Sequence, residues 1–285
     1  MGVFLRQPLR ITHPMPVLRV FEVERLLLHE EPDLGRVRRL TEALRRDGVL
    51  RNPPIVAAMP QGTATVLDGA NRVTALRELG LPHAVVQAVE YDRPEISLST
   101  WRHYVCEEGR ERLRDRVAGL AGVHVSVLRD RLEAGVRLER REAAAAVIDA
   151  RGGTLLGPGA DPVAAADTLN RIVALYLDRG GIHRVENGDD VDALTTDYGP
   201  GTLVVFRTFE KSDILLLAAR GGRLPTGITR HIIPGRALRV NAPLDWLADP
   251  SDVATKQARL EASLRQRWLD HGVRHYAEST FLFDE

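Results

Sequence analysis

The sequence predicts an α/β (α+β) fold in two parts, an N-terminal domain over residues 1–104 and a C-terminal domain over residues 105–285. Three observations support this prediction. Short apolar runs alternate with amphipathic stretches over residues 17–91, an Ala/Arg/Glu-rich stretch of helical character covers residues 105–180, and a mixed α/β pattern returns over residues 181–285. A chain of 285 residues is long enough to bury two cores.

The first expected elements are a strand and an amphipathic helix. The strand covers residues 17–28, which read VLRVFEVERLLL. The helix should follow, because Pro32 and Asp33 are good helix-start residues and Asp47-Gly48 is a stop signal. Between these signals, apolar residues recur every three or four positions, as one buried face requires: Leu34, Val37, Leu40 and Leu44.

Three further strands and a second helix complete the expected N-terminal unit. The runs NPPIVAAM at 52–59 and TATVLD at 63–68 are strands joined by a Pro/Gly turn. The next helix ends before Gly80, which is suited to the position after a helix C-terminus. LPHAVVQAVEY at 81–91 is then a further strand. Strand, helix and strand in close alternation predict a compact α/β unit.

The C-terminal part is expected to begin with helices and to return to a mixed pattern. ERREAAAAVIDARGG at 139–153 is the clearest expected helix. GTLVVFRTF at 201–209 is expected to be a strand, and Ser212 to cap the helix after it. LPTGITRHIIPGR at 224–236 should be a loop because of its Pro and Gly content, and the tail at 251–272 has the period of an amphipathic helix.

Composition excludes several classes of protein. With 44% hydrophobic and 27% charged residues, the chain has neither a disordered nor a membrane composition. The 39 basic and 39 acidic residues cancel, so no global cationic field attracts nucleic acid. The single cysteine, Cys106, cannot form an intramolecular disulfide, and the start MGVFLRQPLRITHP lacks a signal-peptide pattern. We therefore expect a cytoplasmic protein with no membrane partner.

The stretch VLDGANRVTALRELG at 66–80 places polar residues at the corner between a strand and a helix. The first turn of a helix has unpaired N–H groups, and these donors form an anion site at the positive end of the helix dipole. Gly69 permits close backbone approach, while Arg72 and Asn71 can donate to phosphate oxygens. Asp68 suits a phosphate only if a cation such as Mg²⁺ lies between them. The alternative is structural, with Asp68 as a helix cap and Arg72 at the surface.

Two further polar runs are candidates for the chemistry. The run HEE at 29–31 precedes the first helix, where an acid can cap the helix or act as a base. His29 has no metal-ligand spacing and is expected to be structural. The run TRH at 229–231 puts a hydroxyl, a guanidinium and an imidazole in an expected loop, and loops carry binding residues, although a structural turn is the alternative.

Together these motifs resemble a known family. Five stretches are similar, in this order, to the free L-serine kinases of the ParB/sulfiredoxin superfamily. They are LLLHEE, the helix end RRDGVLRNPPIV, the corner VLDGANRVTALRELG, the strand VVQAVEYDRPEI followed by Trp101, and LPTGITRHIIPGR. The resemblance covers residues 17–104 and 200–245. It implies a ParB/sulfiredoxin-like nucleotide-binding domain, followed by a helical and mixed α/β C-terminal domain, with the active site in the cleft between them.

The resemblance also implies an activity and a set of site residues. It predicts phosphorylation of the hydroxyl of free L-serine to O-phospho-L-serine, with ATP or ADP as the donor and Mg²⁺ as cofactor, in amino-acid, siderophore or other natural-product biosynthesis. The catalytic carboxylate falls on Glu30, with its neighbour Glu31 as the alternative. The implied nucleotide-phosphate site is Asp68, Gly69, Ala70, Asn71 and Arg72, with Asp68 also at the metal. The implied serine site is Trp101, Thr229, Arg230 and His231.

The chain departs from this family at three positions, and rival functions stay open. Better-known members carry two histidines where Ala70 and Asn71 stand, and a lysine where Gly227 stands. One alternative is a ParB-like regulator that senses nucleotide and binds DNA through the arginine-rich helices at 110–141, although interleaved glutamates favour a solvated face. The other is a kinase of the same fold for another small hydroxy amino acid, or one that has lost activity through the changes at Asn71 and Gly227. The sequence makes no prediction of oligomeric state.

Overall fold

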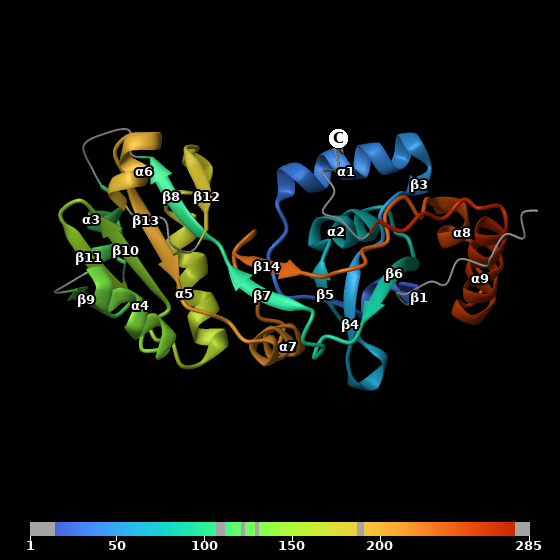
Figure 1. Cartoon of the computed structure of the whole chain (residues 1–285), viewed down its shortest axis with the longest axis horizontal. Coiled ribbons are helices and arrows are strands. Elements are labelled where there is room, and N and C mark those ends of the chain that lie inside the picture. The colour runs from blue at the N-terminus through green and yellow to red at the C-terminus, as the bar shows by residue number, and fades with distance from the viewer. Residues whose placement is uncertain (1–14, 107–111, 121–122, 129–130, 187–190, 277–285) are drawn as a thin grey trace, which may run out of the picture.

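The computed structural model describes residues 15–106, 112–120, 123–128, 131–186 and 191–276. The start of the chain, on which the expectation of no signal peptide depends, lies outside the described residues. The described chain forms two bodies side by side along the long axis of the molecule, each built on a sheet (Figure 1).

The first body contains a five-stranded mixed sheet. In spatial order its strands are β1 (Val17–Glu22), β6 (His83–Val89), β4 (Ile55–Ala58), β5 (Ala64–Asp68) and β2 (Leu26–Leu28). The pairs β1/β6 and β4/β5 are antiparallel, whereas β6/β4 and β5/β2 are parallel. The single strand expected over 17–28 is two strands at opposite edges of the sheet. A 3₁₀ turn at Val23–Arg25 separates them.

Two helices pack on this sheet and on each other. Helix α1 (Leu34–Asp47) begins as predicted, because the Asp33 side chain accepts a hydrogen bond from the Arg36 N–H at 3.0 Å, and it ends at Gly48, whose φ is 67°. Helix α2 (Ala70–Glu78) begins at the predicted corner, directly after β5. Apolar side chains of both helices enter one core with the strands.

The second body contains a six-stranded sheet in which every neighbouring pair is antiparallel. In spatial order its strands are β12 (Ile182–Val185), β8 (Arg102–Cys106), β13 (Gly201–Phe206), β10 (Ala145–Asp149), β11 (Gly152–Leu156) and β9 (Val125–Leu128). The helices of this body are α3 (Leu113–Ala118), α4 (Arg131–Glu139), α5 (Pro162–Ala174) and α6 (Val191–Tyr198).

The expectation of a helical region over 105–180 is wrong for much of its length, since three strands of the second sheet lie within it. The run expected to be the clearest helix, 139–153, contains strand β10, which forms a hairpin with β11. Ala145 to Asp149 are all buried, so both faces of this strand are covered. A strand covered on both faces reads as a continuous apolar run, and burial here overrides the helix propensity of alanine.

Helix α7 (Lys211–Ala219) begins two residues earlier than predicted. Glu210 caps it in place of Ser212, and Glu210 and Asp213 form a reciprocal capping box. Asp213 is tied to this position because it also pairs with Arg207, whose side chain is completely buried. One buried apolar cluster runs from the first sheet through α7 to the second sheet, so the two bodies share a continuous core.

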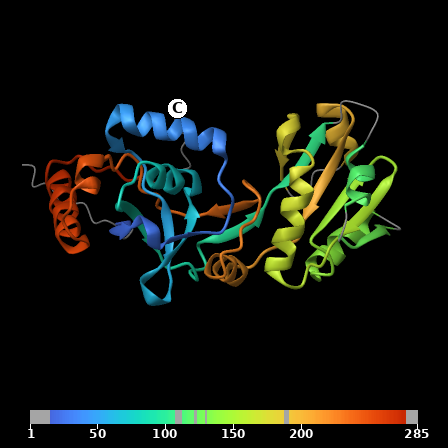
Figure 2. The same ribbon diagram turned by 180° about the vertical axis from the view of Figure 1, so that it is seen from behind.

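The run expected to be a loop at 224–236 contains a strand instead. β14 (Thr229–Ile232) pairs antiparallel with β7 (Ser97–Thr100), and this ribbon crosses between the two bodies (Figure 2). Backbone pairing with β7 overrides the turn signal of the surrounding Pro and Gly. A second short ribbon pairs β15 (Ala242–Pro243) with β3 (Val49–Leu50), and 3₁₀ turns lie at Pro60–Gly62 and Leu177–Arg179.

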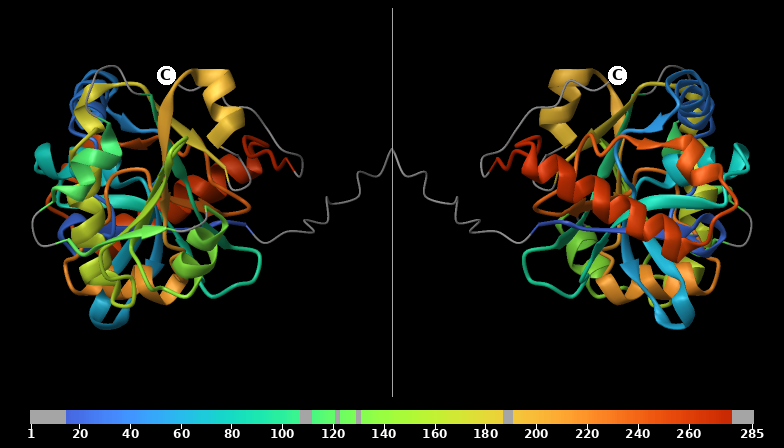
Figure 3. Two further views of the ribbon diagram at one scale, coloured as in Figure 1. Left: turned by 90° about the vertical axis from the view of Figure 1, so that its left-hand side faces the viewer. Right: turned by 90° about the vertical axis from the view of Figure 1, so that its right-hand side faces the viewer.

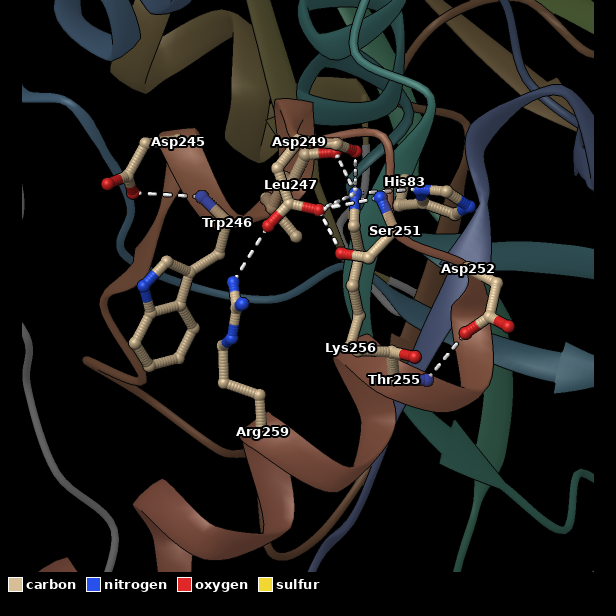
Figure 4. Close-up of polar contacts among 10 residues, drawn as sticks. All are labelled: His83, Asp245, Trp246, Leu247, Asp249, Ser251, Asp252, Thr255, Lys256 and Arg259. Carbon is tan, nitrogen blue, oxygen red and sulfur yellow. Dashed lines mark hydrogen bonds and ion pairs between the residues drawn. The ribbon is translucent and has the colours of Figure 1, made fainter.

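The C-terminal segment returns to the first body. Helices α8 (Leu244–Ala248) and α9 (Val253–Leu269) lie against the first sheet, and α9 has the amphipathic character that the tail predicts (Figure 3). Lys256 of α9 is only 3% exposed, and its Nζ donates to Leu247 O and Asp249 O at 2.7 Å each and to His83 Nδ1 at 3.0 Å (Figure 4). These bonds fasten α9 to the end of α8 and to the first residue of β6. The division at residue 104 stays a prediction.

Within the described chain, no helix combines the length and the apolar character that crossing a bilayer requires.

Candidate active site

Glu30 lies where the two bodies meet, just after β2. Its Oε1 accepts hydrogen bonds from the Thr229 backbone N–H at 2.6 Å and from the Thr229 hydroxyl, and its Oε2 accepts from the Gly227 N–H at 3.2 Å. The backbone around it pairs with Leu224, through Leu224 N to His29 O at 2.7 Å and Glu31 N to Leu224 O at 2.8 Å. The carboxylate is therefore held in one orientation by a segment almost two hundred positions away.

Glu31 has a different environment from its neighbour. Its carboxylate is about half exposed and pairs with Arg223, itself exposed, at 3.2 Å. Such a surface pair contributes little to stability. The two adjacent acids, which the sequence left interchangeable, thus differ in geometry: Glu30 is held by backbone donors at the junction, and Glu31 lies at the surface.

A buried polar cluster lies beside Glu30. The ring of His29 is 3% exposed, with Nδ1 2.7 Å from Val66 O and Nε2 3.0 Å from Thr229 Oγ1. The ring of His231 packs edge-on against it with centroids 5.3 Å apart, and His231 Nε2 lies 2.8 Å from the hydroxyl of Tyr91. Burial lowers the pKa of His29 and lowers the pKa of His231 to about 3. Both rings are therefore neutral at pH 7, and Tyr91 was not singled out by its sequence pattern.

The predicted corner forms an open helix start. Gly69, with φ 103°, is the N-cap of α2, and no side chain caps this end. A side chain at Gly69 would also crowd the guanidinium of Arg72. The structural alternative, in which Asp68 caps α2, is therefore wrong. The N–H groups in the first turn of a helix have no partner within the helix, so an uncapped start directly after Asp68 meets the condition for an anion site.

Arg72 is occupied by protein groups. Its Nη1 donates to Asn52 O at 2.9 Å and Pro53 O at 3.0 Å, and its Nη2 donates to Asp68 Oδ2 at 2.9 Å. In this structure Arg72 thus braces the corner and orients Asp68. If Arg72 donated to phosphate oxygens, as the sequence predicted, these hydrogen bonds would have to break.

Arg236 is a cation of the site that the sequence motifs did not single out. It stands at the end of the run LPTGITRHIIPGR, and its Nη1 donates to Asp68 Oδ2 at 2.9 Å, while its Nη2 donates to His231 O at 3.3 Å. Its side chain is 40% exposed, against 21% for Arg72. Burial acts to raise the pKa of Asp68, but the Arg72 and Arg236 guanidiniums hold it below its usual range.

The other two corner residues have structural contacts. Asn71 Oδ1 accepts a hydrogen bond from the Asp33 N–H at 2.8 Å, so this amide joins the start of α2 to the start of α1. Ala70 is partly buried against the first core. At these two positions, where the chain departs from the family pattern, Asn71 therefore makes a structural hydrogen bond and Ala70 packs against the core.

Trp101 and Arg230 are brought together, but on the other face of the β7/β14 ribbon from Thr229 and His231. The Arg230 guanidinium stacks over the Trp101 ring at 4.6 Å and pairs with Glu186. With Ser99 and Thr100, these three residues line a pocket of about 230 Å³. Alternate residues of a strand point to opposite faces, so the run 229–231 cannot act as one cluster.

The third departure, Gly227, is required by its backbone and its neighbour. Its φ is 72°, in the left-handed region that favours glycine, and a Cβ there would clash with the guanidinium of Arg184. A side chain at 227 would therefore be strained by this backbone and would displace the Arg184 guanidinium, next to the N–H that donates to Glu30.

The described residues contain no group of three or more His, Cys, Asp or Glu side chains that could hold a metal ion by themselves. Asp68 is one carboxylate beside an anion site. Mg²⁺ is commonly held by one or two carboxylates together with substrate phosphates, so this donor set fits Mg²⁺ that arrives with a nucleotide.

Comparison with known proteins agrees with the resemblance drawn from the motifs. The chain is 26% identical over 272 residues to the ATP-dependent L-serine kinase SbnI of Staphylococcus aureus, covering 94% of this chain and 97% of that protein. It is 27% identical over 252 residues to an ATP-dependent L-serine kinase of Staphylothermus marinus, covering 83% and 93%. No family model matches the chain.

Solved structures share the fold. SbnI with a C-terminal truncation, from Staphylococcus aureus, superposes with a TM-score of 0.69 at 21% identity, over 90% of this chain and 97% of that one. A free serine kinase in complex with AMP superposes with a TM-score of 0.65 at 19% identity, over 83% and 97%. The expected fold class and the resemblance to the free serine kinases are confirmed.

Proposed function

We propose that this chain is a serine kinase of the ParB/sulfiredoxin superfamily, which transfers the terminal phosphoryl group of ATP to the hydroxyl of free L-serine. Its small-molecule partners are then L-serine and an adenine nucleotide. The observation that carries the proposal is the position of Glu30, held at the junction of the two bodies by Thr229 and Gly227. The names of the curated relatives, which the chain matches over most of its length, supply the substrate and the donor.

Glu30 is the proposed general base. Phosphoryl transfer depends mainly on positioning and charge neutralisation, and one carboxylate suffices to orient the attacking hydroxyl and accept its proton. Glu30 is partly exposed and has fixed partners, so it can present a lone pair to a substrate without a search of rotamers. Glu31, paired with Arg223 at the surface, is not proposed for this role.

The start of α2 is the proposed phosphate site. Its open N–H groups and the guanidinium of Arg236 would bind phosphate oxygens, with Asn71 contributing its free amide end. Arg72 supports them by orienting Asp68. Asp68 would hold Mg²⁺, which offsets the negative charge of the nucleotide phosphates. In this proposal Arg236, the more exposed of the two guanidiniums, contacts the phosphate, and Arg72 holds the corner in place.

The serine site is proposed on the face of the ribbon that Glu30 contacts. Thr229 and His231 lie on the side of Glu30 and would contact the hydroxyl end of serine. The resemblance also implied Trp101 and Arg230, but these two residues stack on each other on the opposite face of the ribbon, so we do not place them at the hydroxyl of serine.

The rival DNA-binding function finds little support in the arginine-rich region. Arg112 and Arg114 approach the buried Asp149, and Arg137 pairs with Glu133 and Glu142. These arginines are neutralised by acids of the same body. At these three positions of the described region the charges are paired, whereas phosphate binding needs a continuous basic face.

The test is an assay for O-phosphoserine. The purified full chain is incubated with Mg²⁺, L-serine and either ATP or ADP, with L-threonine and L-homoserine as comparison acceptors. Phosphoserine from ATP supports the proposal, and product from ADP alone would revise the donor. Product only from another acceptor would favour the kinase for a different hydroxy amino acid. The absence of any product, together with salt-sensitive duplex binding, would overturn the proposal in favour of the regulator.

A further inference from the structure

His29, Thr229 and Glu30 form a chain of hydrogen-bonding groups that starts at a backbone carbonyl. Val66 O can only accept, so His29 Nδ1, 2.7 Å away, carries the ring proton. Burial lowers the pKa of His29, so the ring is neutral and Nε2 presents a lone pair to the Thr229 hydroxyl at 3.0 Å. The same hydroxyl contacts Glu30 Oε1.

The Thr229 hydroxyl therefore lies between two acceptors. It has one proton, and both His29 Nε2 and the ionised Glu30 carboxylate can take that hydrogen bond. While Glu30 is ionised, its Oε1 accepts the Thr229 N–H in any case, and the single hydroxyl proton can go to Glu30 or to His29 Nε2 but not to both. Once Glu30 carries a proton, its O–H can donate to Thr229 Oγ1, and the Thr229 O–H can donate to His29 Nε2. The contacts from Val66 to His29, from His29 to Thr229 and from Thr229 to Glu30 are then all hydrogen bonds.

We infer that His29 is a positioning residue of the kinase reaction, which acts through the Thr229 hydroxyl to stabilise the protonated form of Glu30. The inference rests on the proposed function. It gives a role to a histidine that the sequence pattern marked as structural. It also explains why a buried imidazole is placed with its free lone pair aimed at the one hydroxyl that contacts the base.

The proton balance of the step is simple. The serine oxygen bonds to the terminal phosphorus of ATP, the bond between that phosphorus and the ADP oxygen breaks, and its electron pair leaves with ADP. The serine proton passes to the Glu30 carboxylate. When Oε1, the oxygen that contacts Thr229, carries this proton, the new O–H can turn about its own C–O bond toward Thr229 Oγ1 while the carboxyl group keeps its orientation. Thr229 keeps its own proton, which it donates to His29.

The experiment is a double-mutant cycle on the full chain with Thr229→Val and His29→Phe, measured as kcat and KM for serine. Each single change should lower kcat by about tenfold, the worth of one hydrogen bond to a charged or reacting group, with a smaller change in KM. The double variant should be no slower than Thr229→Val alone, because His29 acts only through that hydroxyl. Thr229→Ser, which keeps the hydroxyl, should lose far less than Thr229→Val.

The outcomes separate this inference from the proposed function. A wild-type chain that makes no phosphoserine defeats the proposed function itself. An active wild type with multiplicative losses in the double variant would leave the kinase standing and overturn the role of His29. If His29→Phe does not fold, the two Thr229 variants decide the matter, since equal losses in Thr229→Ser and Thr229→Val would show that the hydroxyl has no part.

Discussion

Glu30 accepts hydrogen bonds from both the backbone N–H and the hydroxyl of Thr229, a residue 199 positions further along the chain. Thr229 belongs to the ribbon that crosses between the two bodies. Glu30 lies two residues after β2, an edge strand of the first sheet. The carboxylate of the proposed general base is therefore oriented by the contact between the two bodies. Substitutions on either side of that contact should change kcat.

The two adjacent acids should differ sharply in their effect on rate. Glu30→Gln removes the proposed base but keeps the size of the side chain, so kcat should fall by about 10² to 10⁴ while folding is kept. Glu31→Gln removes a surface ion pair and should change kcat by less than about twofold. Phosphoserine formation measures both variants, with circular dichroism as the control for folding. Equal losses in the two variants would contradict the assignment of the base to Glu30.

Substitutions at Arg236 and Arg72 should have different effects, the first on nucleotide kinetics and the second on stability. Arg236→Ala should leave the unfolding midpoint nearly unchanged and lower kcat/KM for ATP by about ten- to a hundredfold, because it removes a charged donor to phosphate. Arg72→Ala should lower stability, since it releases two backbone carbonyls and Asp68. Arg220→Ala is the matched control, because it removes an exposed arginine that pairs with Asp161 of the second body. Normal nucleotide kinetics in Arg236→Ala would remove it from the phosphate site.

The buried ion pair of Arg207 and Asp213 should be a large determinant of stability. Arg207 is fully buried, donates to Asp213 and to Gly159 O, and stacks over Phe209 at 4.5 Å. Arg207→Ala removes the closer partner of the buried Asp213 and leaves it Arg141 at 3.8 Å, so we expect a loss of about 3 to 5 kcal/mol of unfolding free energy, as for other broken buried pairs. Urea titration would measure this loss. A change below about 1 kcal/mol, as expected for a surface arginine, would show that the pair is dispensable.

Buried histidines should make the protein less stable in mild acid. Burial, together with Arg184, lowers the pKa of His103 to about 4, whereas an unfolded histidine titrates near 6.5. The folded pKa is the lower one, so stability is complete above about pH 6.5 and is lost as the pH falls toward 4. The slope is about 1.4 kcal/mol per pH unit for one such group.

Urea unfolding at pH 7.0, 6.0 and 5.0 measures this loss, and His103→Phe is the informative variant. Its unfolding free energy should fall less steeply with acid than that of the wild type, because the Phe206 and Tyr176 rings can pack on a phenyl ring but no proton can bind. Parallel pH curves for the two proteins would mean that His103 does not contribute.

Local patterns by themselves determined a large part of the first body. The cap at Asp33, the stop at Gly48, the strands around the corner and the open start of α2 all depend on neighbours within a few positions, which the sequence displays directly. The corner and the HEE run were recognisable for the same reason. Helix and turn signals are read locally, so they survive without knowledge of the rest of the chain.

Tertiary structure decided what those local signals cannot contain. The alanine-rich run became strand β10 because both of its faces are covered, and the run at 229–231 became a strand because β7 pairs with it. That pairing sends Thr229 and Arg230 to opposite faces, places Arg236 on Asp68, and aims His29 at the Thr229 hydroxyl. These contacts join residues far apart in the chain, and their energy comes from burial and long-range hydrogen bonds, which no local pattern records.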